Sequence, residues 1–339
     1  MRILLLGLGA VAGRMLEMLG PRRPEFPGLD GLDVEVAAVF TRRHGCWCPE
    51  RPEPVEGVLR ARARGEWLKA RDQGDLKRFI ADGPYDVLVE LTTLSVEGQG
   101  RPAADYVRWA LEAGRHVVTA NKGPMAFQGS SLRRLARRRG RLFRYESAVM
   151  DGAPVFSLAR CGLRGCQVQS FQGILNSTTN FILCALEQGR SFEDALRQAR
   201  KEGFAEADPA HDLQGWDAAC KVSVLANALM EADLHPFSVR RQGLEPSLVQ
   251  RVRRVFRRGE RLRLVCRAER RNGEVVGEVG LQRLSADDEL ARVRGAGGLL
   301  RLETDAMGPI LIVQQAPTLD DTAYGVLNDL MEIASTTGS

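Results

Sequence analysis

The sequence predicts an α/β fold whose first half is a doubly wound parallel sheet, and three observations support this. The apolar run RILLL at 2–6 suits a buried parallel strand. A glycine pattern follows it, with Gly7, Gly9 and Ala12 placed before a helical stretch. Short apolar runs then alternate with helical segments as far as residue 147, which is typical of strands joined by crossover helices. The sequence therefore predicts a Rossmann-type nucleotide-binding domain.

Each further element of this half follows the same alternation. Strands are expected at 34–40, 85–92, 116–120 and 141–147, with helices between them. The glycine loop would place a dinucleotide pyrophosphate against the backbone of Gly7, Gly9, Ala10, Val11 and Ala12. The opening MRILLLGLGAVAG also imitates an export signal, but the strands that follow favour the nucleotide fold.

Composition narrows the class of protein. The 339 residues are 44% apolar and 27% charged, and no window is long and apolar enough for a membrane helix, so a soluble protein of two domains is expected. The net charge is only +5, and the arginines at 249–264 alternate with apolar residues, which favours a solvated amphipathic face over a nucleic-acid partner. Seven cysteines without a regular framework predict reduced thiols, a cytoplasmic location and no zinc site.

The residues at the end of the second expected strand indicate whether NAD or NADP is the cofactor. An acidic residue there would bind the ribose hydroxyls of NAD, whereas this chain has Thr41, Arg42 and Arg43. NADP is therefore favoured over NAD, with Arg42 as the preferred ligand of the 2′-phosphate. The alternative is that both arginines are simply exposed loop residues. Thr92 and Thr93, after a later strand, are also assigned to the cofactor site.

Several segments of the chain, in order, resemble the homoserine dehydrogenase family: VVTANKGPMAF, ESAVMDGAPV, GILNSTTNFIL, GFAEADPAHDLQGWDAACK and TAYGVLNDL. The resemblance implies an NAD(P)-dependent oxidoreductase that acts on a CH–OH group and interconverts L-homoserine and L-aspartate 4-semialdehyde in threonine and methionine biosynthesis. It also implies a homodimer. Because the chain ends at Ser339, we expect a short form without a regulatory domain.

The second half predicts an α+β domain with a mixed sheet, which would bind the substrate, carry the catalytic groups and form the dimer contact. Strand-like segments lie at 262–269, 274–284, 299–305 and 310–315, and a final helix at about 321–336 is expected to return to the first domain. We therefore expect a dinucleotide-binding domain at 1–150, completed by 305–339, and a catalytic domain at 151–304.

The catalytic groups are expected on a helix that runs from about Asp212. Asp217 and Lys221 are four residues apart and would share one helix face, and the apolar residues after them indicate partial burial, which suits a lysine that acts as an acid or base. The resemblance implies that Lys221 exchanges the hydroxyl proton, and Lys122 is an open alternative that would also contact the cofactor. The resemblance further implies that the substrate is bound by Glu206, Asp217, Asp212, Asn176, Ser177, Thr178 and Thr179.

Some of these residues also have structural explanations. Asp208 before Pro209 fits a turn, Asp212 fits a helix N-cap or an orienting role, and Asn176 begins an expected helix. Cap and ligand roles are compatible, because a helix N-terminus favours anions.

Two segments depart from the family pattern. The resemblance implies a monovalent cation such as Na⁺, held by backbone carbonyls of Glu146, Val149, Asp151 and Ala153. Met150 and Asp151 stand where the family has glycines, which would alter this loop. Residues 314–317 replace a glycine-rich loop near the cofactor, so this loop is expected to shift outward or to impair closure on the nicotinamide.

Two alternative functions stay open. The chain would be a non-catalytic NADP-binding sensor if the altered loop has abolished turnover. It would otherwise be another two-domain NAD(P) oxidoreductase acting on an amino-acid-derived alcohol or aldehyde. An enzyme with a thiolate nucleophile is disfavoured, because no cysteine lies beside an obvious catalytic histidine in the sequence.

Overall fold

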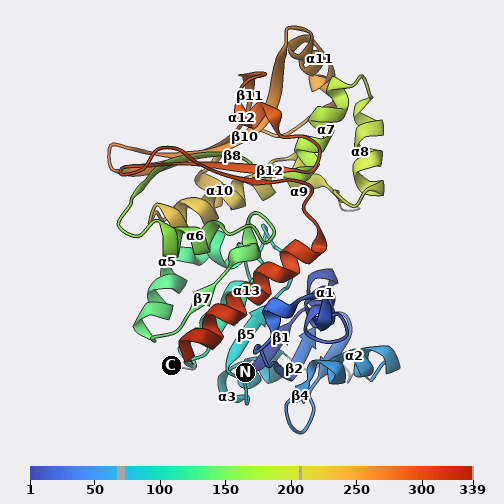
Figure 1. The fold of residues 1–339 in the computed structure, drawn as a ribbon, viewed down its shortest axis with the longest axis vertical. Coiled ribbons are helices and arrows are strands. Elements are labelled where there is room, and N and C mark those ends of the chain that lie inside the picture. The colour runs from blue at the N-terminus through green and yellow to red at the C-terminus, as the bar shows by residue number, and fades with distance from the viewer. Residues whose placement is uncertain (67–72, 206–207, 338–339) are drawn as a thin grey trace. The chain divides into compact units, whose positions relative to one another are not determined.

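A computed structural model describes residues 1–66, 73–205 and 208–337, which form two compact units (Figure 1). The first unit comprises Met1–Pro154 and Thr318–Ser339, and the second comprises Val155–Pro317. The second boundary lies later than the expected 304/305. The reason is that β13 (Ile310–Gln314) pairs with β12 (Gly298–Thr304), so residues 305–317 belong to the second unit.

The first unit is built on a largely parallel sheet in the order β3-β2-β1-β5-β6-β7, as the sequence predicts. Pairing is parallel between β1 and β2, β1 and β5, β5 and β6, and β6 and β7, while β3 and β4 join β2 antiparallel. The strands are β1 (Arg2–Leu6), β2 (Glu35–Thr41), β3 (Gly45–Trp47), β4 (Glu53–Pro54), β5 (Val87–Glu90), β6 (His116–Thr119) and β7 (Phe143–Arg144).

Two groups of helices accompany this sheet, which is the doubly wound arrangement. The first group packs α1 (Ala10–Leu19) against α2 (Val55–Arg64) and α13 (Leu319–Thr337). The second group packs α4 (Ala103–Glu112) against α3 (Gln73–Asp82) and α5 (Lys122–Arg138). The core between the sheet and the first group contains Ile3, Leu5, Met15 and Val326. Its apolar residues come from both ends of the chain.

The return of α13 to the first unit confirms the expected final helix and depends on two glycines. A Cβ atom on Gly152 would lie 2.0 Å from the carbonyl oxygen of Asp321. A Cβ atom on Gly325 would lie 2.3 Å from Ser147 Oγ and 2.8 Å from the Cα atom of Gly152. Only two residues without side chains allow the helix to approach the loop at 149–154 this closely.

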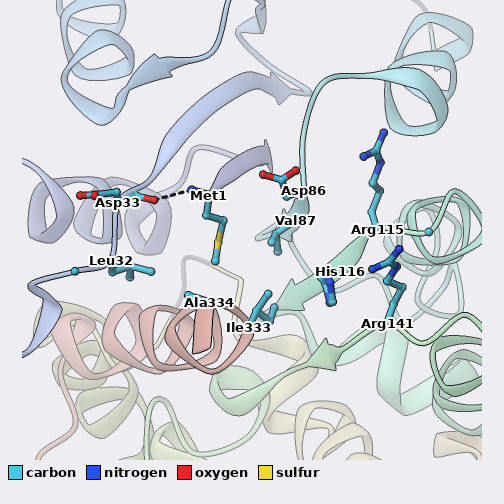
Figure 2. A pocket seen from close by; sticks show the side chains of 12 residues that line it. Met1, Leu32, Asp33, Asp86, Val87, Arg115, His116, Arg141, Ile333 and Ala334 are labelled. Carbon is cyan, nitrogen blue, oxygen red and sulfur yellow. Dashed lines mark hydrogen bonds between the residues drawn. The ribbon is translucent and has the colours of Figure 1, made fainter. Parts of the chain in front are cut away.

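A cavity of about 500 Å³ opens at the amino-terminal edge of the first sheet (Figure 2). Met1 precedes β1, Asp86 precedes β5 and His116 begins β6, while Ile333 and Ala334 come from α13. Open parallel sheets bind their ligands beyond the carboxyl ends of the strands. The cavity therefore lies at the opposite edge from the glycine loop, and we assign it no part in binding the cofactor.

The second unit contains the expected mixed sheet, in the order β13-β12-β8-β10-β11-β9. Its pairs are antiparallel except for β9 with β11. The further strands are β8 (Val168–Ile174), β9 (Arg240–Arg241), β10 (Glu260–Arg271) and β11 (Glu274–Ser285). The helices are α6 (Val155–Gly162), α7 (Ser177–Glu187), α8 (Phe192–Lys201), α9 (Ala210–Leu213), α10 (Trp216–Leu229), α11 (Val249–Arg257) and α12 (Glu289–Arg292). The arginine-rich segment forms α11 and the start of β10, as its spacing predicts.

The helix expected from about Asp212 is in fact two helices, α9 and α10, separated by Gly215. Gly215 has a φ of +78°, and a Cβ atom there would lie 2.9 Å from the carbonyl oxygen of Gln242. The left-handed conformation ends α9 and lets a distant loop pack against the break. Asp212 therefore does not cap α10, and the N-cap expectation for this residue is wrong.

None of the helices in the described ranges combines the length and the apolar character that a membrane crossing requires. The seven cysteines all lie in the described part of the chain and form no disulfide.

Candidate functional site

The loop between β1 and α1 in the first unit has the geometry of a pyrophosphate-binding turn. Gly7 has a φ of +90°, and its amide donates a hydrogen bond to the carbonyl of Phe40 at 2.9 Å. A Cβ atom on Gly7 would lie 2.7 Å from the carbonyl oxygen of Leu91, so glycine is required where the ends of three strands meet. A Cβ atom on Gly9, the N-cap of α1, would meet nothing within 4 Å among the described residues. The space above this helix start is open, which fits a phosphate group.

Arg42 and Arg43 lie at the tip of the hairpin between β2 and β3. Thr41 closes the hairpin, because its hydroxyl accepts a hydrogen bond from His44 N at 2.9 Å and donates one to Gly45 O at 3.0 Å. Both arginines are exposed and follow the carboxyl end of β2, the edge that also carries the glycine loop. This placement fits cofactor binding and leaves the guanidinium groups accessible to a phosphate.

A buried carboxylate joins the carboxyl ends of β5 and β6. Glu90 is 0% exposed and accepts hydrogen bonds from Thr92 N at 2.8 Å, from the hydroxyl of Thr92, and from the hydroxyl of Thr119 at 2.7 Å. Burial raises the pKa of Glu90, while the hydrogen bonds from Thr92 and Thr119 oppose this effect. The side chain of Thr92 thus holds the loop together, and Glu90 is a site residue that the sequence analysis missed.

Lys122 begins α5 beside this network. The N-cap residue Asn121 accepts a hydrogen bond from Gly123 N at 2.9 Å through its side chain, and its amide group reaches the carbonyl of Thr93 at 3.5 Å. Lys122 is half-buried and lies at the carboxyl end of β6. The cap fixes the backbone of this lysine relative to Thr92 and Thr93.

The second unit gathers most of the expected substrate-binding residues around Asn176. The side-chain nitrogen of Asn176 donates to Asp212 Oδ1 at 2.7 Å and to Asp217 Oδ2 at 3.0 Å. Asp212 also accepts a hydrogen bond from the hydroxyl of Thr178 at 2.9 Å. Burial and the neighbouring charge of Asp217 raise the pKa of Asp212. The orienting role that was open for Asp212 therefore has specific partners.

Lys221 lies one helical turn after Asp217, on the same face of α10. Its Nζ donates to the carbonyl of Leu175 at 2.6 Å and lies 3.3 Å from Asp217 Oδ2. The side chains of the two residues are 15% and 14% exposed, so the expectation of partial burial is confirmed. Behind them, the thiol of Cys266 is fully enclosed, and burial raises its pKa to about 12. An ion pair in such a site is screened much less than one at the surface.

Among the remaining residues of this group, Thr179 is internal, Ser177 is partly accessible and Asp208 is exposed. Thr179 donates its amide to the side chain of Asn176 at 2.9 Å and its hydroxyl to the carbonyl of Asn176 at 3.1 Å, which confirms the helix start. Ser177 is half-buried and makes no hydrogen bond with its side chain among the described residues. Asp208 accepts a hydrogen bond from Ala210 N at 3.1 Å, in keeping with the expected turn. Glu206 lies outside the described residues.

The segment proposed for a cation packs against α13 in the first unit. Glu146 is 1% exposed, and its amide donates to Asp329 at 2.8 Å. Asp151 has a φ of +50°, and its carboxylate accepts a hydrogen bond from the hydroxyl of Thr322 at 3.2 Å. The loop thus takes a left-handed conformation although aspartate replaces glycine there. Val149 and Ala153 flank this residue in the same loop.

The segment 314–317 links β13 to α13. Gln314 ends β13, and Ala316 has a φ of +46°, a conformation that favours glycine. The backbone therefore adopts a glycine-like turn here although the glycines are absent.

Comparison with known proteins agrees with this geometry. A family profile described as homoserine dehydrogenase matches residues 154–331, and one described as homoserine dehydrogenase, NAD binding domain, matches residues 7–146. The NAD(+)-dependent homoserine dehydrogenase of Pseudomonas canavaninivorans is 32% identical, over 98% of this chain and 96% of that protein. The homoserine dehydrogenase of Sulfurisphaera tokodaii is 30% identical, over 98% of each chain.

Solved structures give the same result. The homoserine dehydrogenase of Thermoplasma acidophilum superposes with a TM-score of 0.82 at 26% identity, over 98% of this chain and 99% of that one. That of Thiobacillus denitrificans has a TM-score of 0.82 at 28% identity and covers 100% of this chain and 74% of that one. The glycine loop, the Asn176 cluster and these matches together show that the chain belongs to the homoserine dehydrogenase family.

Proposed function

We propose that this protein interconverts L-homoserine and L-aspartate 4-semialdehyde with a nicotinamide dinucleotide. The observation that carries the proposal is the part-buried Asp217–Lys221 pair beside Asp212, in a chain whose first unit has an open pyrophosphate turn. Homoserine carries an ammonium, a carboxylate and a primary alcohol. Its oxidation needs acceptors for the first, donors for the second and a proton acceptor at the third.

The residues divide this work as follows. Asp217 and Asp212 accept from the substrate ammonium, and Glu206 is assigned to the same end by resemblance. Ser177 and the first turn of α7 favour the carboxylate, because a helix N-terminus attracts anions. Lys221 takes the hydroxyl proton, and its position next to Asp217 stabilises the ammonium that forms. The bound cofactor supplies the acceptor for the hydride.

Lys122 is the alternative proton carrier. It lies at the carboxyl end of β6, where a parallel sheet binds its ligand, and we assign it to contacts with the cofactor. We favour Lys221 because it has a carboxylate partner at 3.3 Å. Substitution of each lysine separates the two roles, since loss of Lys122 would weaken cofactor binding whereas loss of Lys221 would not.

We assign NADP as the preferred cofactor, with Gly7, Gly9, Ala10, Val11 and Ala12 at the pyrophosphate. The support is the exposed pair Arg42 and Arg43 at the end of β2, because guanidinium groups match a 2′-phosphate. The similar Pseudomonas canavaninivorans protein is named as NAD(+)-dependent, which is the opposite preference. The affinity of this chain for each of the two cofactors is therefore the quantity to measure. The parent should bind NADP about tenfold or more tightly than NAD. Arg42→Gln should abolish this difference in dissociation constant. Equal constants in the parent would refute the assignment.

We also propose a monovalent cation such as Na⁺ at the carbonyls of Glu146, Val149, Asp151 and Ala153. The buried carboxyl group of Glu146 supports it, because a carboxylate enclosed in this way needs a positive partner. Activity should rise when NaCl replaces choline chloride at constant ionic strength. An identical rate in the two salts would argue against the site.

We further propose a homodimer formed through the second sheet. Val276, Leu311 and Val313 are 47%, 41% and 54% exposed, and the register places them on one face with Arg301 and Glu278. A face that carries apolar groups and both signs of charge can pair with a second copy of itself. Light scattering should give twice the chain mass for the parent and for Met307→Asp, and a single-chain mass for the double variant Leu311→Asp, Val313→Asp. A parent of single-chain mass would contradict the proposal.

The activity itself is tested with the purified protein, L-homoserine and NADP or NAD. Reduced cofactor should form with L-homoserine but not with L-2-aminobutyrate, which lacks the hydroxyl group. The reverse assay should oxidise NADPH when L-aspartate 4-semialdehyde is added. Cofactor binding without turnover in either direction would refute the proposed function.

A further inference from the structure

The side chain of Asn176 has used every hydrogen bond that it can donate. Both N–H groups of its amide are engaged, one by Asp212 at 2.7 Å and the other by Asp217 at 3.0 Å. Its carbonyl oxygen caps α7 by accepting from Thr179 N at 2.9 Å. The residue is 6% exposed. A primary amide has only two N–H donors, so no donor remains for a substrate.

We propose that Asn176 is a positioning residue that holds the carboxylates of Asp212 and Asp217 at a fixed separation, instead of a residue that binds the substrate. This inference rests on the proposed function, because it assigns those carboxylates to the substrate ammonium. It corrects the role that the family resemblance implies for Asn176. It also explains why an amide stands at a helix N-cap where serine or aspartate would cap equally well.

The electrostatics of the cluster require such a bridge. Asp212 and Asp217 come from different helices, α9 and α10, and like charges at this distance repel. Both oxygens lie within 3.0 Å of the same nitrogen atom, so the amide screens the repulsion with one donor for each carboxylate. Lys221 contacts Asp217 from α10, and Thr178 contacts Asp212 from α7. Each carboxylate is thus fixed by a second partner, and Asn176 touches both.

Cys266 of β10 is a further titratable group near the cluster, and it stays neutral because burial raises its pKa to about 12. Lys221 lies 3.3 Å from Asp217, and in its protonated form it also favours the ionised form of Asp212. Removing the Asn176 donor should make Asp212 harder to ionise beside a charged Asp217. The acidic limb of the pH profile for kcat/KM should then move to higher pH.

The sharpest variant is Asn176→Asp. Aspartate caps helices as well as asparagine does, so α7 keeps its N-cap while the two donors become a third negative group. We expect the KM for L-homoserine to rise by about tenfold or more, the acidic limb to move to higher pH, and the dissociation constant of NADP to stay unchanged. Asn176→Ser, which caps without charge, should raise KM to a smaller extent. It supplies the comparison if the aspartate variant does not fold.

Asn180 offers a matched control on the same helix. It is also buried, at 2% exposure, but its amide donates to the carbonyl of Gly295 at 2.9 Å. Asn180→Asp should lower thermal stability without moving KM or the pH profile. Folded Asn176→Asp or Asn176→Ser with the parent KM and pH profile would overturn the inference. A parent without homoserine oxidation would instead refute the proposed function, so the two failures can be told apart.

Discussion

At the scale of single residues, the site depends on polar groups that the fold has enclosed. Glu90 and Asn176 are almost entirely buried. Glu90 accepts hydrogen bonds from two different elements, and Asn176 donates to carboxylates of two different helices. Buried polar groups must be paired, because an unpaired one costs as much as its lost hydration. These residues therefore set the geometry of the site without being its most exposed members.

Glu90 should control the affinity for the cofactor. In Glu90→Leu, the amide and hydroxyl of Thr92 and the hydroxyl of Thr119 lose their acceptor, so the loops after β5 and β6 loosen. We expect the dissociation constant of NADPH to rise by about tenfold, as measured by the fluorescence of its reduced nicotinamide. Glu112→Leu, an exposed change on α4, should leave it unaltered. An unchanged constant in Glu90→Leu would exclude this role.

Replacing Ala316 with glycine should cost less stability than replacing an ordinary helical alanine with glycine. Its φ of +46° places the Cβ atom in the left-handed region, where an L-residue pays about 1–2 kcal/mol that glycine avoids. Ala316→Gly should be neutral or stabilising by up to about 1 kcal/mol. The gain is smaller than the strain relieved, because glycine also makes the unfolded chain more flexible. Ala63→Gly, at an exposed position of α2, should cost about 1 kcal/mol in urea unfolding. Equal losses in both variants would remove the argument from strain.

At the scale of elements, close contacts between helices, loops and strands determine where the site residues lie. Gly325 lets α13 touch the loop at 149–154, and Glu187 joins the end of α7 to the second sheet. Both contacts connect segments that are distant in sequence. Substitutions at these two contacts should lower the stability of the unit that contains them. They should affect the site only as a consequence of that loss of stability.

Gly325→Ala should destabilise the first unit. The new methyl group would lie 2.3 Å from Ser147 Oγ and 2.8 Å from Gly152, so the helix or the loop must move. We expect a loss of about 1–3 kcal/mol in chemical unfolding. Gly28→Ala, where a Cβ atom would meet no described residue within 4 Å, is the control and should be close to neutral. The contact is unimportant if the two variants unfold alike.

Glu187→Gln should destabilise the second unit. Arg263 is 0% exposed and donates to Glu187 at 2.6 Å, and Arg294 reaches the other oxygen at 3.2 Å. Removal of the negative charge leaves a buried guanidinium without its counter-ion, which typically costs about 3–5 kcal/mol. Glu202→Gln, at an exposed position after α8, should have little effect on the same unfolding curve. A loss below 1 kcal/mol for Glu187→Gln would show that the pair behaves like a surface ion pair.

At the scale of the whole molecule, stability should depend on pH through His116 in the first unit. His116 is buried, and its Nδ1 accepts a hydrogen bond from Leu142 N at 3.0 Å. Burial, Arg141 and Arg144 lower its pKa below the ordinary value of 6.5, and Asp86 opposes them. Stability from a lowered pKa is present above the unfolded value and is lost as the pH falls through the folded value.

The midpoint of thermal unfolding should therefore fall as the pH is lowered below about 6.5. His116→Asn replaces the imidazole with an amide oxygen that can accept from the same backbone N–H group without titrating. This variant should show a smaller loss between neutral and mildly acidic pH. The same slope in parent and variant would assign the acid sensitivity to other groups.

The sequence predicted most of the fold because local patterns agree with it. The strands of the first sheet, the mixed sheet and the returning α13 all appear at the expected segments. The break at Gly215 was missed because its cause is contact with Gln242, a residue of a distant loop. Glu90 was missed because an acid inside the run VLVEL gives no sign of its threonine partners. The double use of the Asn176 amide likewise exists only after α9 and α10 have folded against α7.

The most direct measurement of the central claim is the rate of NADP and NAD reduction by L-homoserine in the parent and in Lys221→Ala, with the dissociation constant of each cofactor measured alongside. Proton transfer by a positioned side chain contributes about 10²- to 10⁴-fold to a rate. The account predicts an active parent, a loss of that size in Lys221→Ala, and cofactor binding equal to that of the parent. A folded Lys221→Ala protein with the parent rate would contradict it.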